Sequence, residues 1–188
     1  AELERNKIYI KIKHASSTFG LFNLSEAQFD MVRLGKSVYG IMPLLLKDSD
    51  CKLNPVMVVK THILSIKKVA KGIRIGYGYN FITEKVTTIG TIPFGFADGC
   101  IWEPKQTNMR VIVQDQIIPI IGRICMDFLM IDITSLENNI TLGEEVIIVG
   151  KSKNNSIRLV EIAVQTRTIP TYVATSLGAK TPKTYITQ

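Results

Sequence analysis

Short runs rich in valine, isoleucine and threonine recur along the chain after residue 55, and they constrain its fold more than any other feature. β-branched side chains favour extended backbone, and connections as short as these join antiparallel neighbours. Glycine, asparagine, aspartate and proline separate the runs. The pattern predicts a mainly β region, built as an antiparallel barrel or sandwich. The predicted strands are residues 56–68, 73–75, 86–92, 110–113, 116–121, 124–133 and 145–149.

Helical character returns only near the end of the chain, at about residues 157–165 and 170–177. Pro170 suits the first turn of a helix, where a backbone N–H is not needed, and Gly178 suits a C-terminal stop.

The region before residue 50 has a different pattern. Apolar and polar residues alternate over 8–13, which is the period of a strand. A turn-like stretch at 14–18 follows, then a short helix beginning at Ser25, and then a second strand over 29–34. Strand, loop, helix and strand is the order of a β/α unit, in which the loops after the strands carry the chemistry.

Pro43 and the polar residues 47–50 end this β/α pattern. We therefore predict a domain boundary near residue 50, with residues 1–50 as one domain and residues 51–188 as a β-rich second domain.

The composition is that of a globular protein that can bury a core, with 46% hydrophobic and 21% charged residues among 188. No apolar run approaches the length of a membrane span. Cys51, Cys100 and Cys125 form no Cys-x-x-Cys pair, so we expect neither a disulfide framework nor a zinc site, and a reducing cytoplasm is the default compartment. The net charge of +7 is scattered over lysines without interleaved aromatics, which favours a solvated basic surface over nucleic-acid binding.

Three glycine-containing blocks stand out because local propensity does not require them. They are Gly-Tyr-Gly at 76–78, the segment 87–99 that ends Pro-Phe-Gly-Phe-Ala-Asp-Gly, and Gly-Arg-Ile-Cys-Met-Asp at 122–127. Together they resemble the C-terminal domain of the alanine racemase family, pyridoxal-phosphate (PLP) enzymes that invert the α-carbon of an amino acid. The resemblance runs from about residue 8 to residue 185 in the family's order.

The resemblance implies a (β/α)₈ barrel that binds PLP, followed by a mostly β domain. Residues 1–50 would then be the last strands of the barrel, and residues 51–188 the β domain. The first residues look like the polar end of a helix cut from a longer chain. No segment resembles the family's lysine segment that carries the cofactor, so we expect the 188 residues to be inactive alone.

The resemblance assigns Tyr77 as one of two catalytic bases. Racemisation removes a proton from a weakly acidic carbon, and the protein supplies a base on each face of the substrate. In the family one base is the cofactor lysine and the other is a tyrosine from the partner subunit. Because tyrosine ordinarily has a pKa near 10, positive charge or hydrogen bonds must favour its ionised form.

Cofactor-binding residues follow from the same resemblance. Arg33 corresponds to the arginine that contacts the pyridine nitrogen of PLP, and a guanidinium cannot give that nitrogen a full proton, so the ring is a weaker electron sink. Phosphate contacts correspond to Ser16 and Ser17 and to Gly35 and Lys36. Ser16 stands where the family has asparagine, and Lys36 where it has isoleucine.

Three positions of the second domain complete the predicted site. Met126 corresponds to the residue whose backbone N–H approaches the substrate carboxylate, and Asp127 would order its loop. Phe96 replaces the tyrosine of the usual Gly-Tyr-Ala-Asp-Gly, so the hydrogen bond at the entrance of the site is in doubt. Thr171 stands where a tyrosine usually bonds the phosphate. A shorter side chain there leaves more room beside the substrate, and relatives with this change include enzymes that accept serine.

The sequence thus predicts a racemase that interconverts L- and D-alanine and supplies D-alanine for peptidoglycan. It also predicts serine as a second substrate. The resemblance implies a head-to-tail homodimer in which Tyr77 and Met126 serve the neighbour's cofactor, and no metal. A PLP decarboxylase of the same two-domain class is less consistent, because its Cys-Glu-Ser-Gly-Asp segment is absent. A β domain used for dimerisation or binding without catalysis remains an alternative, and a lysine segment encoded upstream of residue 1 would favour the enzyme.

Overall fold

The computed structural model describes residues 2–42, 51–79, 81–101 and 109–186. The chain divides into two compact units, residues 1–56 and residues 57–188. Pro43 and the polar residues 47–50, on which the predicted boundary near residue 50 depends, lie outside the described residues.

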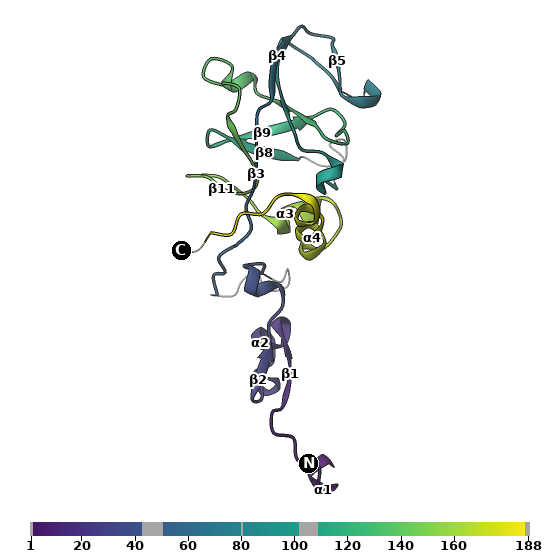
Figure 1. Ribbon diagram of the computed structural model, residues 1–188, viewed down its shortest axis with the longest axis vertical. Coiled ribbons are helices and arrows are strands. Elements are labelled where there is room, and N and C mark those ends of the chain that lie inside the picture. The colour runs from purple at the N-terminus through teal and green to yellow at the C-terminus, as the bar shows by residue number, and fades with distance from the viewer. Residues whose placement is uncertain (1, 43–50, 80, 102–108, 187–188) are drawn as a thin grey trace. The chain divides into compact units, whose positions relative to one another are not determined.

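The first unit contains a short parallel sheet of β1 (His14–Ser17) and β2 (Met31–Arg33), in which Ser17 pairs with Arg33 (Figure 1). The helix α2 (Thr18–Asn23) connects the two strands. The segment is therefore a β/α unit, as the sequence predicts. Its remaining described elements are α1 (Glu2–Arg5), η1 (Ser25–Ala27) and η2 (Lys36–Tyr39).

The boundaries inside this unit differ from the predicted ones. Residues 8–13 do not form a strand, and the stretch 14–18, predicted as a turn, is instead β1 over 14–17 followed by the first residue of α2. The helix begins at Thr18, and Ser25 begins only a single 3₁₀ turn. The alternating pattern of 8–13 fits a strand only if another strand pairs with it, and the described partner, β2, pairs with residues 14–17.

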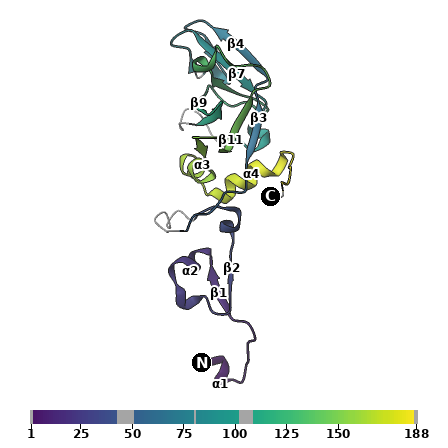
Figure 2. The same cartoon turned by 90° about the vertical axis from the view of Figure 1, so that its left-hand side faces the viewer.

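The second unit is built on a strongly curled antiparallel sheet, a half-barrel, which confirms the mainly β prediction (Figures 1 and 2). The strand order is β12-β11-β8-β9-β10-β7-β4, and β3 also pairs with β11. A second, two-stranded sheet pairs β5 with β6. The strands are β3 (Val59–His62), β4 (Ser65–Val69), β5 (Arg74–Ile75), β6 (Phe81–Ile82), β7 (Thr87–Ile92), β8 (Arg110–Val113), β9 (Gln116–Ile121), β10 (Leu129–Asp132), β11 (Glu145–Lys151) and β12 (Ser156–Ile157).

The core of this unit consists mostly of β-branched side chains of the curled sheet. Burying each such side chain stabilises the fold by roughly 1.5–3 kcal/mol. Stiff isoleucine and valine side chains pack well on a pleated surface, so the same residues favour the strands and fill the core. The fully buried members include Ile92, Val111, Ile112, Val113, Ile118, Leu129, Ile131, Ile133 and Ile148.

Two helices follow the sheet, α3 (Leu159–Gln165) and α4 (Pro170–Lys180), and they lie side by side (Figures 1 and 2). Pro170 occupies the first turn of α4, as predicted. Gly178 does not stop the helix, because it lacks a left-handed conformation and α4 continues to Lys180. No helix among the described residues is long and apolar enough to cross a membrane.

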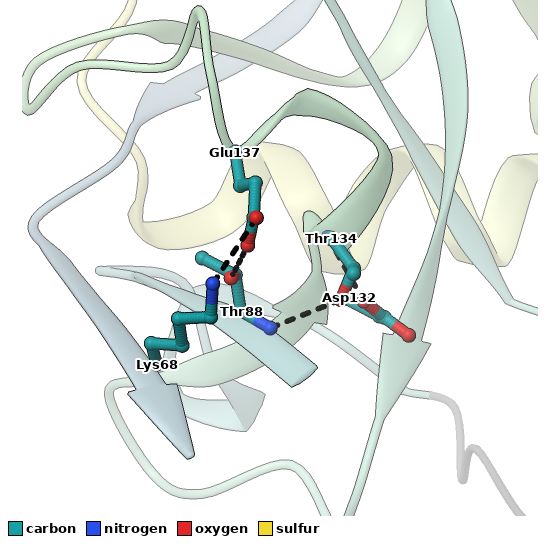
Figure 3. Close-up of polar contacts among 5 residues, drawn as sticks. All are labelled: Lys68, Thr88, Asp132, Thr134 and Glu137. Atoms are coloured by element: carbon teal, nitrogen blue, oxygen red, sulfur yellow. Dashed lines mark hydrogen bonds and ion pairs between the residues drawn. The ribbon is translucent and has the colours of Figure 1, made fainter. Parts of the chain in front are cut away.

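A polar network joins β4, β7 and the 3₁₀ turn η6 (Thr134–Leu136) (Figure 3). The Thr88 hydroxyl donates to Glu137 at 2.7 Å, and the Lys68 ammonium lies 3.1 Å from the other Glu137 oxygen. These two partners, Thr88 first, lower the pKa of the Glu137 carboxyl. Asp132 accepts hydrogen bonds from the N–H and hydroxyl of Thr134, and so caps η6.

A second polar cluster ties the β8–β9 turn to the β11–β12 turn. The carboxylate of Asp115 accepts hydrogen bonds from the Ser152 hydroxyl and from the backbone N–H of Asn154, and the Asn155 amide donates to the Asp115 carbonyl. These donors, Ser152 first, lower the pKa of Asp115 to about 2.

Asp115 should therefore contribute to acid stability. Its ionised form is favoured in the folded state, so its contribution is complete above its ordinary pKa of 3.8 and is lost as the pH falls through about 2. We expect Asp115→Asn to be less stable than the natural chain at pH 7, and we expect that difference to shrink between pH 4 and pH 2. Urea-unfolding midpoints measured across this range would test it. A difference independent of pH would contradict the assignment.

Candidate functional site

Tyr77 lies at the tip of the β5–β6 hairpin, in the 3₁₀ turn η4 (Tyr77–Tyr79). The hairpin is fixed to the sheet by Ile75, which is buried against Ile89 and Ile121. Its base is closed by the buried Thr83, whose hydroxyl donates to the carbonyl of residue 70 at 2.7 Å and accepts the N–H of residue 73 at 2.9 Å. The tip is therefore held by an apolar anchor and a closed base.

The Tyr77 side chain is 74% exposed, so its hydroxyl is not part of its own core. Gly76 and Gly78 on either side have left-handed φ angles of 79° and 73°, which other residues rarely adopt. The glycine-flanked bend thus presents a large aromatic side chain to the outside. Its catalytic role stays a prediction.

The hairpin tip packs directly on the Gly122–Arg123 backbone. A Cβ atom built on Gly76 would lie 2.8 Å from the Arg123 nitrogen. Only a glycine fits this approach without a shift of backbone. The first and third sequence blocks, 76–78 and 122–127, are therefore in contact.

The register of the central strands brings the second block to the same place. Leu129 at the start of β10 pairs with Ile92 at the end of β7, and Met130 pairs with Ile121 at the end of β9. The segments that extend beyond these strand ends, 93–99 and 122–128, are consequently neighbours. The N–H of Phe96 donates to the Cys125 carbonyl at 3.1 Å, and the N–H of residue 97 donates to the Met126 carbonyl at 2.9 Å.

Residues 76–78, 95–98 and 122–127 together form what we call the three-loop surface. Tyr77, Phe96 and Met126 are all exposed on it. Asp98, which the sequence analysis missed, accepts the N–H of Gly95 at 2.9 Å and caps the 3₁₀ turn η5 (Phe96–Asp98). Asp127, predicted to order the loop, is exposed and makes no hydrogen bond to a described residue.

The predicted cofactor residues of the first unit gather at the carboxyl ends of β1 and β2. The parallel register places Ser17 beside Arg33. The Ser16 hydroxyl is buried and donates to the carbonyl of residue 27 at 2.8 Å, and the Gly35 N–H donates to the Thr18 hydroxyl at 3.1 Å. The side chains of Ser17 and Lys36 make no hydrogen bond or ion pair with the described residues.

Arg33 has a partner that the sequence analysis did not identify. Its guanidinium contacts Nδ1 of His14, at the start of the neighbouring strand. His14 stood in a stretch predicted as a turn, so nothing in the sequence pattern placed it opposite Arg33. The contact follows from the parallel pairing of β1 with β2.

Thr171 lies in the second unit, in the first turn of α4. This helix contacts η5, so Thr171 belongs to an element that packs on the three-loop surface. The described residues contain no cluster of three or more His, Cys, Asp or Glu side chains able to hold a metal ion.

Residues 56–185 match the family model described as "Alanine racemase, C-terminal domain". The chain is 37% identical over 184 residues to alanine racemase 2 of Caldanaerobacter subterraneus subsp. tengcongensis, a match that covers 98% of this chain and 47% of that protein. The chain thus spans about half the length of the curated relatives it matches.

Solved structures agree with the sequence matches. An alanine racemase of Clostridium difficile 630, in complex with cycloserine, aligns with a TM-score of 0.84 at 32% identity and covers 94% of this chain and 46% of that one. The alanine racemase of Bartonella henselae with covalently bound pyridoxal phosphate aligns with a TM-score of 0.77 at 29% identity, over 94% of this chain and 47% of that one.

The contact between Gly76 and Arg123 can be tested with a matched pair of variants. Gly72 has a similar φ of 84° but no atom within 4 Å of a Cβ built on it. Gly72→Ala should cost roughly 1–2 kcal/mol for the left-handed conformation alone, or a few degrees in Tm. Gly76→Ala should lower Tm further, because the 2.8 Å contact must also be relieved. Equal shifts in Tm would show that the hairpin tip and residue 123 are not packed together.

Proposed function

Because the chain belongs to the alanine racemase family, we propose that it is the C-terminal half of a PLP-dependent racemase that interconverts L- and D-alanine. The observation that carries this proposal is the three-loop surface, where an exposed tyrosine hydroxyl and an unused backbone N–H project from one rigid frame. A proton-transfer group beside a donor for a carboxylate is what an amino-acid racemase requires.

The residues at the ends of β1 and β2 fit a phosphorylated pyridine in part. Ser17 and Lys36 keep donors for a phosphate, and Arg33, oriented by His14, offers its guanidinium to a ring nitrogen. Ser16 and Gly35 fit less well, because their donors are already used within the unit. Bound PLP would acidify the α-carbon of the substrate by delocalising its electrons.

Tyr77 and Met126 perform the protein's part of the reaction in this proposal. The Tyr77 hydroxyl exchanges a proton with the α-carbon on one face, and a lysine outside these residues serves the other face. The Met126 N–H binds the substrate carboxylate and so fixes which face meets Tyr77. The Arg33 guanidinium keeps its proton and stabilises the ring nitrogen only by a hydrogen bond.

A head-to-tail homodimer would complete the site. Tyr77, Phe96 and Met126 are apolar or aromatic and exposed, and clusters of this kind are found at protein interfaces. We propose that the three-loop surface of one subunit serves the cofactor of the other. We further propose that the parent protein works in the cytoplasm and supplies D-alanine for peptidoglycan, without nucleic acid or metal as a partner.

Replacing Tyr77 by phenylalanine in the complete enzyme should slow racemisation by about 10²–10⁴-fold, the usual contribution of a general acid–base group. The α-proton of one enantiomer should still exchange with deuterated solvent, because the base on the other face remains. Tyr185→Phe, at an exposed tyrosine outside the three-loop surface, is the control and should leave both rates unchanged.

Loss of exchange and racemisation together in Tyr77→Phe would argue against the two-base assignment. A complete protein that forms dimers but racemises no amino acid would instead favour the non-catalytic binding module. The 188-residue chain, assayed alone, should show no racemisation.

Thr171 leads us to propose serine as a second substrate. A tyrosine at this position would fill space beside the substrate, and a change of this size in a pocket typically alters discrimination by about tenfold or more. Thr171→Tyr should therefore lower the ratio of kcat/KM for L-serine to that for L-alanine by roughly tenfold. Strict selectivity of the natural enzyme for alanine would reject the proposal.

A further inference from the structure

In the peptide unit between Cys125 and Met126, the carbonyl is hydrogen-bonded within the described part of the chain and the N–H is not. Its carbonyl accepts the N–H of Phe96 at 3.1 Å, while its Met126 N–H donates to no group of the described residues. From this geometry we infer that Asp98 is a positioning residue. Through η5 it orients the Cys125–Met126 peptide so that the Met126 N–H binds the substrate carboxylate.

The direction of the Met126 N–H follows from peptide geometry. The described chain has no cis peptide bond, and in a trans peptide the C=O and N–H bonds point in opposite directions. Because the Cys125 carbonyl points toward η5, the Met126 N–H points away from it. The turn is also closed by the Cys125 N–H, which donates to the Phe128 carbonyl at 2.8 Å, so the peptide cannot rotate freely.

Asp98 fixes the donor on the other side of this contact. Its carboxylate accepts the Gly95 N–H at 2.9 Å, and its own N–H donates to the Gly95 carbonyl at 3.0 Å. This ring of two hydrogen bonds sets the start of η5 and therefore the direction of the Phe96 N–H.

Gly95 makes the contact close. A Cβ atom at Gly95 would lie 2.2 Å from the Met126 carbonyl oxygen and 2.5 Å from that of Cys125. The two segments therefore approach at backbone distance, and any change in η5 moves the Cys125–Met126 peptide.

The same hydrogen bond strengthens the Met126 N–H as a donor. A peptide whose carbonyl accepts a hydrogen bond becomes more polarised, and its N–H then binds an anion better. Asp98 acts on the substrate indirectly, through a series of backbone hydrogen bonds and peptide units that runs over Gly95, Phe96 and Cys125 to the Met126 N–H. It does not touch the substrate itself. This role rests on the proposed racemase function.

The first test uses Asp98→Ala and Asp98→Asn in the complete enzyme. In Asp98→Ala, KM for L-alanine and for D-alanine should rise by the same factor, about five- to tenfold, because both enantiomers share the carboxylate. The kcat should change by less than about twofold, the signature of lost uniform binding. Asp98→Asn keeps an acceptor oxygen for Gly95 and should restore most of the natural KM.

Propionate, a carboxylate without an amino group, provides an independent readout. Its inhibition constant should rise in Asp98→Ala by the same factor as KM. The matched control is Asp132→Ala, which removes the carboxylate that caps η6 at the opposite end of β10. It should lower Tm but leave KM and propionate inhibition unchanged. An equal rise of KM in both variants would reduce Asp98 to a structural role and overturn the inference.

A second pair of variants decides the case if Asp98→Ala does not fold. Phe96→Pro removes the N–H that bonds Cys125, and proline is tolerated at the first position of a helical turn after an extended residue such as Gly95. Phe96→Ala removes the ring alone. The inference expects a higher KM in Phe96→Pro than in Phe96→Ala, and equal values would overturn it.

The two proposals fail in different ways. A natural enzyme that racemises alanine, with KM unaffected in folded Asp98→Ala, overturns the role of Asp98 and leaves the racemase function intact. A natural enzyme that racemises no amino acid overturns the function itself.

Discussion

The pairing of β10 with β7 on one side and β9 on the other is the constraint on which the candidate site depends. Leu129 pairs with Ile92, and Met130 pairs with Ile121. The loop after β7, the loop after β9 and the loop before β10 therefore leave the sheet at the same place. A shift by one residue would turn every side chain of β10 to the other face and expose Leu129 and Ile131. The buried side chains thus fix the register, and the register fixes which loops meet.

Close backbone contacts join those loops. Gly76 lies on the Gly122–Arg123 backbone, and η5 bonds two successive carbonyls of the 122–127 segment. Backbone contacts leave the side chains of Tyr77, Phe96 and Met126 free to face outward. Exposed side chains on a frame of backbone contacts are compatible with the proposed homodimer, because burial in their own subunit would keep them from reaching a second chain.

The sequence predicts the sheet well where burial alone determines a strand. The runs 110–113 and 116–121 match β8 and β9 to the residue, because most of their residues are valine or isoleucine and a turn separates the two runs. Prediction is poorer in the first unit, where residues 8–13 have the alternation of a strand but β2 pairs with 14–17. Gly178 shows the complementary limit, since a residue type that suits a helix end does not determine where the helix stops.

The candidate site could be predicted only in part. Its residues are predicted from a family resemblance, whereas the strands are predicted from burial. The resemblance to a family predicts roles for Tyr77, Arg33 and Met126, whereas nothing in the sequence pattern points to Asp98 or His14. Asp98 bonds a backbone N–H three residues earlier, and His14 meets Arg33 only because two strands pair in parallel.

The hydrogen-bond donors of the predicted site residues fall into two groups: those used within the fold and those left without a partner among the described residues. Donors used within the fold, such as those of Ser16 and Gly35, stabilise the loops that contain them. The side-chain donors of Ser17 and Lys36 and the backbone N–H of Met126 donate to no described residue. Positively polarised groups left without partners suit anions, because an anion bound there gains hydrogen bonds that water alone would otherwise supply. The proposed function would use these donors for a phosphate at Ser17 and Lys36 and for a carboxylate at Met126.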